Sequence, residues 1–571
     1  MSLSPTVTAR LDQMIAELND GERAWAREPL ASRRALLMQV HANVAAHADE
    51  WVRIAGDIKR LPAGCALLGE EWTSGPWAVL EYAPALAESL TRLEQGRDLL
   101  QGCRVGTAPG GRVTVDVLPY HVYDRLLLSG FKAQVWMEPG VTEQETREHA
   151  GLAQRAPEHT AGVAVVMGAG NIFSIAPLDT LYQLYAYNRV VLLKLNPVTD
   201  PLLPVLAAVF APLIDRGYLR IVTGDASVGD HLVNHPGVDA VHITGSEATH
   251  DVIVWGAGAA GTEAKAAGTP RLTKPITSEL GGVCPTIVMP GRWSTADIRF
   301  QAEHIATQRL HNSGFNCIAA QVVIVSRDWP QKQEFFAALR AAFAAAPARP
   351  AWYPGCDLRV AEARRTHPTY ETVGGTAERT LLWNLDLGDA TEPAFGTEYF
   401  GPVLGVAELP GTGVDFLDAA IDAANDRLHG TLGANLVIDP RTRRRLGPQL
   451  RERIARLRYG TIGVNAWTAV GYLAARATWG AFPGHTLDDV QSGRGVVHNA
   501  LLLHRPERTV VSGPFRPLPR SIASGEFSIM PKPPWFVTNR TAATTGRRLA
   551  GFAARPRWAA LAGIFASALR G

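Results

Sequence analysis

Residues 162–171 read Gly-Val-Ala-Val-Val-Met-Gly-Ala-Gly-Asn, an uninterrupted apolar run followed directly by a glycine-rich turn. Stretches with helical spacing separate this run from similar short apolar runs at 190–193, 219–222, 240–243 and 286–288. Short apolar runs that alternate with helices are typical of a parallel sheet covered on both faces, so the sequence predicts a doubly wound α/β fold. Such a sheet binds ligands beyond the carboxyl ends of its strands, and the loops predicted to form a site are 168–171, 194–197 and 244–246.

The chain on either side of this central part has a different pattern. Residues 8–60 have helical spacing, and the looser stretch after residue 105 contains strand-like runs at 112–117 and 133–137. A second α/β part follows, with strand-like runs at 321–325 and 433–438. The length of the chain and this change of pattern predict several packed units.

Composition and charge exclude several classes of protein. The chain has 571 residues, of which 46% are hydrophobic and 19% charged, and its formal net charge is +2. This composition excludes disorder across the whole chain, and the charge gives no field that would recruit nucleic acid. The five cysteines form no CxxC pair and the sixteen histidines no H-E-x-x-H, so neither a disulfide framework nor a metal site is expected. The start lacks a signal-peptide layout, which predicts a cytoplasmic protein.

Two isolated residues could carry chemistry. Cys317 follows His-Asn-Ser-Gly-Phe-Asn, a stretch of loop-forming residues, and Glu279 is followed by Leu-Gly-Gly. A single cysteine is usually a small buried hydrophobe and a glutamate is usually solvated, so neither residue alone indicates a function. The loop nevertheless predicts an accessible thiol, and the glycines let the backbone at Glu279 approach a ligand closely.

Several motifs, taken in order along the chain, match one family. They are GAGN ending at Asn171, Leu-Leu-Lys194-Leu, Ile-Thr-Gly245-Ser246, Ser-Glu279-Leu-Gly-Gly and Glu398-Tyr-Phe400-Gly-Pro. Cys317 lies 38 residues after Glu279. This series resembles the aldehyde dehydrogenase superfamily over roughly residues 160–500. The Glu-Leu-Gly-Gly and Glu-x-Phe-Gly-Pro elements are its most specific parts.

The resemblance implies three catalytic residues. Cys317 would attack the aldehyde carbonyl as a thiolate, and Asn171 would hold the oxyanion with its side-chain amide. Hydride transfer to the nicotinamide would leave a thioester on Cys317. Glu279 would then activate the water that hydrolyses the thioester to the carboxylic acid. Side chains near the family's substrate tunnel would be Trp467, Tyr472, Trp479 and Phe482, which implies an apolar aldehyde.

The same resemblance implies the cofactor residues. Lys194 resembles the lysine that binds the adenosine ribose, and Gly245 and Ser246 precede a helix N-terminus suited to a pyrophosphate. Glu398 resembles the carboxylate that holds the nicotinamide ribose, with Phe400 packed beside the ring. Pro197 stands where the family's NAD-selective carboxylate is expected, so both NAD and NADP are candidate cofactors. The sequence also departs from the family in the small GAGN loop, at Phe315 two residues before Cys317, and at His250 in the pyrophosphate helix.

The resemblance also implies an architecture. The expected parts are an N-terminal helical part of the cofactor domain (1–104), a β insert for oligomerisation (105–160), a dinucleotide-binding domain (161–291), an α/β catalytic domain (292–478) and a C-terminal return with a basic and apolar tail (479–571). Because the family's β extension pairs between subunits, a homodimer or homotetramer is expected.

Two other functions remain open at this point. An acyl-CoA reductase would pass the thioester to CoA, and the Gly-x-Gly-Asn loop together with the Cys-x-x-x-Gln run at 317–321 resembles the long-chain fatty acyl-CoA reductases. A catalytically retired scaffold that binds a partner is the second alternative. After Glu526 the tail carries seven positive charges among apolar residues. This pattern favours packing on the neighbouring subunit or over the substrate entrance, and contact with a membrane surface is the alternative.

Overall fold

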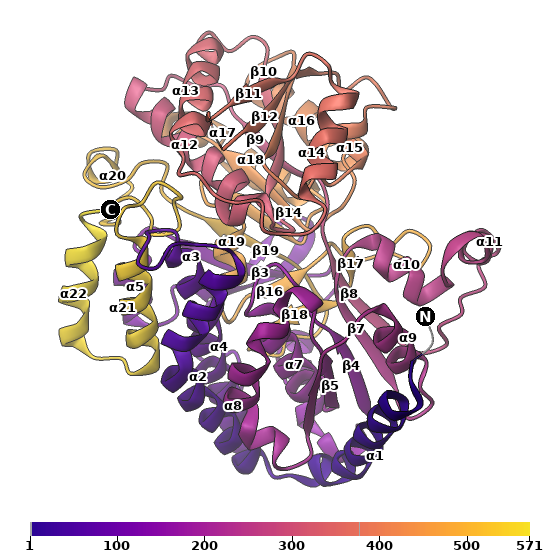
Figure 1. Cartoon of the computed structure of the whole chain (residues 1–571). Helices are drawn as coiled ribbons and strands as arrows, with labels where there is room; N and C mark the ends of the chain where they lie inside the picture. Colours follow the sequence, from indigo (N-terminus) through magenta and orange to yellow (C-terminus); the bar gives the residue numbers. More distant parts are fainter. Residues whose placement is uncertain (1–2, 376) are drawn as a thin grey trace.

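Two β-sheets organise the chain, and they meet where Gly281 and Gly282 join strand β8 to strand β9 (Figure 1). The computed structural model describes residues 3–375 and 377–571. A six-stranded cofactor sheet and an eleven-stranded catalytic sheet result, and both contain runs of parallel strands. This architecture confirms the predicted α/β class.

The cofactor sheet has the strand order β17-β8-β7-β4-β5-β6. Its parallel strands are β4 (Val163–Met167), β5 (Val190–Lys194), β6 (Leu219–Val222), β7 (Ala240–Gly245) and β8 (Ile276–Leu280), and β17 (Gly493–Arg494) pairs antiparallel with β8. Successive strands are added on one side of β4 and then on the other, which makes the sheet doubly wound. The loops after β4 and β7 therefore lie at the switch point, where this topology binds ligands.

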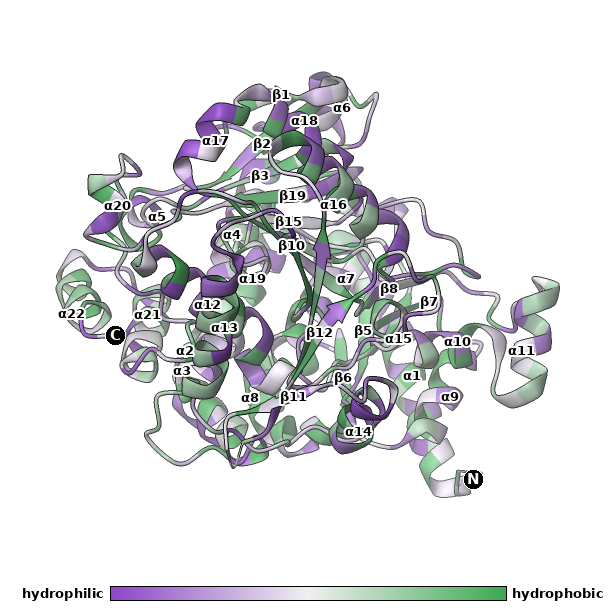
Figure 2. Ribbon diagram, turned by 90° about the horizontal axis from the view of Figure 1, so that it is seen from above, coloured by the Kyte–Doolittle hydropathy of each residue, from purple (hydrophilic) through white to green (hydrophobic). Residues whose placement is uncertain are grey.

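Helices cover this sheet. They include α1 (Pro5–Arg27), α7 (Ile175–Ala186), α8 (Leu203–Ile214), α9 (Ala226–Asn234) and α10 (Glu247–Trp255), and α11 (Gly258–Ala267) projects beside α10 (Figure 2). The stretch Pro197–Ile214 is long and apolar enough to cross a membrane by composition alone. In the structure α8 packs against α2 (Leu30–Ile58), and Asn43 donates from its amide to the carbonyls of Ala208 and Val209. This packing accounts for the apolar side chains of α8.

The catalytic sheet carries the second half of the chain. Its parallel core comprises β9 (Cys284–Val288), β10 (Ala320–Ser326), β12 (Arg379–Leu385), β13 (Val403–Leu409), β14 (Gly433–Val437), β15 (Thr461–Val464) and β19 (Pro506–Ser512), with β11 (Glu371–Val373) antiparallel at one edge. The expectation that residues 286–288 belong to the cofactor sheet is wrong, because β9 pairs with β10 and β14. The last parallel strand of the cofactor sheet is β8, which carries Glu279 and comes just before β9 in the chain.

Helices also flank the catalytic sheet and the β insert. They are α5 (Val122–Leu127), α6 (Glu143–His149), α12 (Thr295–Leu310), α13 (Lys332–Ala345), α14 (Cys356–Thr366), α15 (Pro393–Gly396), α16 (Gly413–Arg427), α17 (Pro440–Leu446), α18 (Pro448–Arg456), α19 (Ala469–Leu473) and α20 (Arg520–Ala523). Helix α12 starts with a capping box in which Ser294 and Asp297 satisfy each other's backbone N–H groups, so its first turn is well fixed. A separate two-stranded sheet is formed by β16 (Thr478–Gly480) and β18 (Val496–His498).

The β insert extends the catalytic sheet of its own chain. Strands β1 (Val105–Ala108), β2 (Arg112–Leu118) and β3 (Lys132–Met137) follow one another, and β3 pairs antiparallel with β19 (Figure 2). Because β19 also pairs with β15, the insert and the catalytic sheet form one continuous sheet within a single chain. The pairing predicted between subunits is thus not needed to complete this sheet, and the oligomeric state stays a prediction.

The basic, apolar tail folds back onto the N-terminal helices. Its helices α21 (Ala542–Ala554) and α22 (Trp558–Ala568) lie beside α2, α3 (Leu68–Trp72) and α4 (Ala78–Glu94) at one side of the molecule (Figure 1). Gly69 lies so close to Ala542 that a side chain at position 69 would overlap it. Phe552, Leu561 and Ile564 are buried in a cluster with Tyr123. The tail therefore packs on its own chain, and packing on a neighbouring subunit stays a prediction; Trp558 of α22 and Leu569, which follows it, are exposed.

Removal of residues 538–571 should therefore destabilise the protein. The deletion uncovers the faces of α2 and α3 that α21 buries, and it loses three large buried side chains, a cost on the order of 5 kcal/mol. We expect a lower midpoint of thermal unfolding by circular dichroism. Phe552→Ala should reproduce about 3 kcal/mol of this loss, whereas Trp558→Ala, at an exposed position of the same tail, should cost little. Unchanged stability combined with lost binding to anionic vesicles would instead identify the tail as a membrane-binding segment.

Candidate active site

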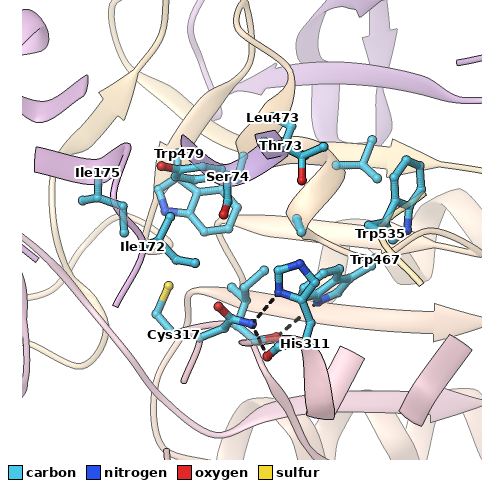
Figure 3. A pocket seen from close by; sticks show the side chains of 15 residues that line it. Thr73, Ser74, Ile172, Ile175, His311, Cys317, Trp467, Leu473, Trp479 and Trp535 are labelled. Carbon is cyan, nitrogen blue, oxygen red and sulfur yellow. Dashed lines mark hydrogen bonds between the residues drawn. The ribbon is translucent and has the colours of Figure 1, made fainter. Parts of the chain in front are cut away.

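Cys317 lies at the wall of an apolar pocket between the two sheets (Figure 3). The cavity has about 50 Å³ open to water-sized molecules. We call it the Cys317 pocket, and it is lined by Thr73, Ser74, Ile172, Ile175, His311, Asn316, Cys317, Ile318, Trp467, Ala469, Val470, Tyr472, Leu473, Trp479 and Trp535. Nearly all of the exposed lining is apolar, which suits a hydrophobic ligand with one polar end.

The loop before Cys317 has an unusual backbone. Asn312 and Ser313 have φ values of 55° and 58°, in the left-handed region that costs non-glycine residues energy. The buried carboxylate of Glu70, in α3, accepts a hydrogen bond from the N–H of Asn312 at 2.9 Å and stabilises this conformation. The N-terminal helices therefore hold the cysteine loop in place.

A buried charge cluster supports Glu70. Its carboxylate forms an ion pair with Arg349, and beside it Lys59 Nζ lies 2.9 Å from Glu71 Oε1. His311 also approaches Glu70, but burial lowers its pKa to about 4, so its imidazole is neutral. Removal of one partner from such a cluster would leave an uncompensated buried charge. None of these residues has a sequence signal, because their neighbours lie far away along the chain.

Glu279 and Cys317 come together across the boundary between the sheets. The carboxyl group of Glu279, at the end of β8, accepts a hydrogen bond from Trp479 Nε1 at 3.1 Å and lies beside the thiol of Cys317. Burial raises the pKa of Glu279 to about 7. Burial and the neighbouring Glu279 raise the pKa of the Cys317 thiol well above its ordinary value. The pair therefore combines a protonated nucleophile with a carboxylate of near-neutral pKa that can accept its proton.

Asn171 reaches the same loop from the other side. It follows β4, and its side-chain amide donates to the carbonyl of Phe315 at 2.9 Å. Asn312 in turn donates from its amide to the carbonyl of Asn171 at 3.0 Å. One N–H of the Asn171 amide is used in this contact and the second is available for a ligand oxygen.

Glu398 and Phe400 lie near Gly281, on the catalytic-sheet side. Oε1 of Glu398 is buried and has no hydrogen-bond partner among the described residues. Burial raises the pKa of Glu398 to about 8, although the guanidinium of Arg309 opposes the shift. Phe400 packs against Phe315 and Tyr353, with ring centroids 5.7 and 5.2 Å apart. A ligand hydroxyl group would satisfy the orphaned carboxylate oxygen.

The remaining predicted cofactor residues lie at the carboxyl ends of the cofactor strands. Lys194 ends β5, Gly245 ends β7, and Ser246 caps α10 by accepting a hydrogen bond from the N–H of Thr249. Burial lowers the pKa of Lys194, and the nearby carboxylates of Asp200 and Asp225 oppose the shift. Asp200 lies three residues after Pro197, and its Oδ1 is buried without a partner among the described residues. Asp200 thus places a carboxylate near Lys194, although Pro197 stands where the family's acid is expected. Nothing in the sequence indicated this role for Asp200.

The predicted aromatic residues divide into two groups. Trp467, Tyr472 and Trp479 line the Cys317 pocket. Phe482 does not line it, because its ring packs under the guanidinium of Arg508, 4.9 Å from the centroid. The pocket also contains Trp535, whose only sequence signal was its place in an apolar tail.

One other group of side chains has a shape that could suit a metal. Asp12, His231 and His235 lie together where α1 meets α9, outside the pocket. However, His235 Nδ1 accepts a hydrogen bond from the N–H of Gly237 at 3.0 Å, so the ring proton of the neutral imidazole lies on Nε2, toward Asp12. Hydrogen bonding explains this group without a metal.

Comparisons with known proteins agree with the order of the motifs. The Aldehyde dehydrogenase family matches residues 133–363. Geranial dehydrogenase of Castellaniella defragrans is 26% identical over 345 residues, which cover 55% of this chain and 66% of that protein. The 3,6-anhydro-alpha-L-galactose dehydrogenase of Streptomyces coelicolor is 26% identical over 322 residues, covering 56% of this chain and 51% of that protein. The matched regions thus span about half to two thirds of these relatives.

Solved structures share the fold over most of the chain. The NADP-dependent glyceraldehyde-3-phosphate dehydrogenase of Bacillus halodurans, solved with NADP, superposes with a TM-score of 0.58 at 19% identity, covering 90% of this chain and 92% of that chain. Lactaldehyde dehydrogenase of Escherichia coli gives 0.57 at 18% identity, covering 88% and 91%. Residues 133–363 match the aldehyde dehydrogenase family, and most of the chain shares the fold of solved aldehyde dehydrogenases at low identity.

Proposed function

We propose that this protein oxidises an apolar aldehyde to the carboxylic acid with NAD or NADP as electron acceptor. One observation carries the proposal: Cys317, at the wall of an apolar pocket, adjoins Glu279, whose carboxyl group is held by Trp479 of the same wall through a hydrogen bond at 3.1 Å. A nucleophile and a base are thus paired where an aldehyde would enter. The names of the relatives, a geranial dehydrogenase and an anhydrogalactose dehydrogenase, support the same reaction class.

Residues from both sheets would form a single binding site for the cofactor. Lys194, Gly245 and Ser246 would hold the adenosine ribose and pyrophosphate, and Glu398 and Phe400 the nicotinamide half. The orphaned Oε1 of Glu398 supports this assignment, because a ribose hydroxyl would give it a donor. The bound nicotinamide supplies the hydride acceptor.

Acylation would begin with a proton transfer within the Cys317–Glu279 pair. As the sulfur attacks the carbonyl carbon, the thiol proton moves to the carboxylate of Glu279, which avoids a free buried thiolate beside a negative charge. The carbonyl oxygen gains charge and would be held by the free N–H of Asn171. Oxidation of the resulting thiohemiacetal leaves a thioester on Cys317.

Deacylation separates the proposal from its rivals. Water is a poor nucleophile at neutral pH and needs a base beside the thioester, whereas the thiol of CoA supplies some thiolate unaided. Glu279 lies in position to act as that base after it has lost its proton. This favours hydrolysis over an acyl-CoA reductase, and a retired scaffold would have no need of the pair.

Cys317→Ala should abolish aldehyde oxidation, by about a thousandfold or more in kcat/KM. Cys317→Ser should be nearly as inactive, because an alcohol is far less ionised than a thiol near neutral pH. Both variants should still bind nucleotide in a fluorescence titration, since the cofactor contacts come from other loops. Cys284→Ala provides the matched control, because this buried cysteine lies behind Cys317 and donates from its thiol to the Cys317 carbonyl at 3.5 Å. Wild-type turnover by Cys317→Ala would refute the nucleophile.

Steady-state turnover should rise with pH through about 7, the pKa of Glu279. Below this pH the carboxyl group is protonated and cannot accept a proton, and above it the base form predominates. Glu279→Gln should give a slowed burst of reduced cofactor, because the thiol of Cys317 loses its proton acceptor, and should then stop as an acyl-enzyme visible by intact mass. If the wild type needs added CoA to turn over, or Glu279→Gln runs at full rate, the acyl-CoA reductase replaces this proposal.

Asp200→Asn should shift nucleotide preference toward NADP. The carboxylate beside Lys194 repels a 2′-phosphate, and its removal should raise NADP affinity relative to NAD by about tenfold, or ~1.4 kcal/mol. Fluorescence titrations with both nucleotides measure the ratio. Asp215→Asn, an exposed acid after α8, is the control and should leave the ratio unchanged. An unchanged ratio in Asp200→Asn would mean that Asp200 does not face the adenosine ribose.

A further inference from the structure

A second cavity lies next to the Cys317 pocket. We call it the outer chamber; it is small, with about 20 Å³ open to water-sized molecules, and it lies beneath the proline-rich segment that leads into the tail. Its walls include Phe131, Phe300, Met530 and Phe536. Trp467 and Trp535 line both cavities, so these two indoles form the partition between them. Figure 3 places both on the far side of the pocket from Cys317.

The two partition residues are held differently. The indole N–H of Trp467 donates to the carbonyl of Ile318 at 3.5 Å, and its ring lies edge-on to His311 at 4.9 Å. Trp535 has an edge-on contact with Phe131, with ring centroids 5.6 Å apart, and its N–H makes no hydrogen bond to the described part of the chain. The side chain of Trp535 is therefore the partition member with fewer restraints.

The backbone that carries Trp535 is fixed to α12. Phe536 stacks on both Phe300 and His304, and the N–H of Val537 donates to Thr307 Oγ1 at 3.3 Å. Lys532 adds an ion pair with Glu303 at 2.9 Å. Helix α12 leads directly into the cysteine loop, so the tail positions Trp535 relative to Cys317 with little freedom in the main chain. Because the main chain is fixed, the partition can open only if the side chain of Trp535 rotates.

We propose that Trp535 sets the chain length of the substrate, and that the substrates are linear aliphatic aldehydes. With the aldehyde carbon at Cys317, a short alkyl chain ends against Trp535 inside the Cys317 pocket. A longer chain needs the indole of Trp535 to turn aside, because the outer chamber is too small to take an alkyl chain while the indole is in place. This inference rests on the proposed oxidation of an apolar aldehyde, and it assigns the tail a role in specificity.

The test compares kcat/KM across saturated linear aldehydes of increasing length, from propanal to dodecanal. In Trp535→Ala the two cavities join, so the ratio of dodecanal to propanal should rise about tenfold or more over the wild type. Trp535→Phe keeps an aromatic partition and should change the ratio less. Trp558→Ala removes an exposed tryptophan of the same tail and should leave the ratio unchanged.

The outcomes separate this inference from the proposed function. A rate change of equal size at every chain length would overturn it, because that is the behaviour of an entrance lid, and an unchanged profile would overturn it as well. Should the wild type oxidise no aldehyde, the proposed function fails, and calorimetry with hexanoate and dodecanoate still tests the partition by binding alone. Tighter binding of dodecanoate relative to hexanoate in Trp535→Ala supports it, and an unchanged ratio refutes it. Trp535→Leu takes the place of the alanine variant if that variant does not fold.

Discussion

The close approach of two sheets at Gly281 and Gly282 determines the rest of the site. A side chain at position 281 would overlap the carboxyl group of Glu398, and one at 282 would lie 3.0 Å from the backbone of Gly430. Because neither glycine carries a side chain, β8 and β9 can belong to different sheets and still be joined by a few residues. This short link brings Glu279, on the cofactor sheet, against Cys317, on the catalytic sheet.

The N-terminal helices and the tail then stabilise the position of Cys317 beside Glu279. Glu70 holds the left-handed backbone before Cys317, and Arg349 and Lys59 compensate the buried charges of Glu70 and Glu71. The tail packs over the same helices and contributes Trp535 to the pocket. Segments more than 200 residues away from Cys317 along the chain thus fix its surroundings, which explains why a buried charge cluster is kept beside an apolar pocket.

Apolar runs predicted nine of the nineteen strands in the described residues, because burial on both faces leaves a clear pattern in the sequence. An apolar run does not indicate which sheet a strand joins. The sequence therefore predicts residues 286–288 in the cofactor sheet, whereas they lie in the catalytic sheet. Strand β8 was missed because Thr277, Ser278 and Glu279 interrupt its apolar character, although the family resemblance still identified Glu279. Glu70, Asp200 and Trp535 could not be found from the sequence, because their importance comes from contacts between distant segments. Phe482 shows the converse, since its position near the other aromatic residues in the sequence does not place it in the pocket.

The order of the strands along the chain has a consequence for biosynthesis. Strand β19 completes the sheet between β3 and β15, yet it is made after all of the other strands. A nascent chain that has not yet emerged from the ribosome beyond residue 512 therefore presents two unpaired strand edges, which favour pairing with other chains. Messages truncated upstream of this strand should yield products that depend on chaperones, even when every predicted catalytic residue has been translated.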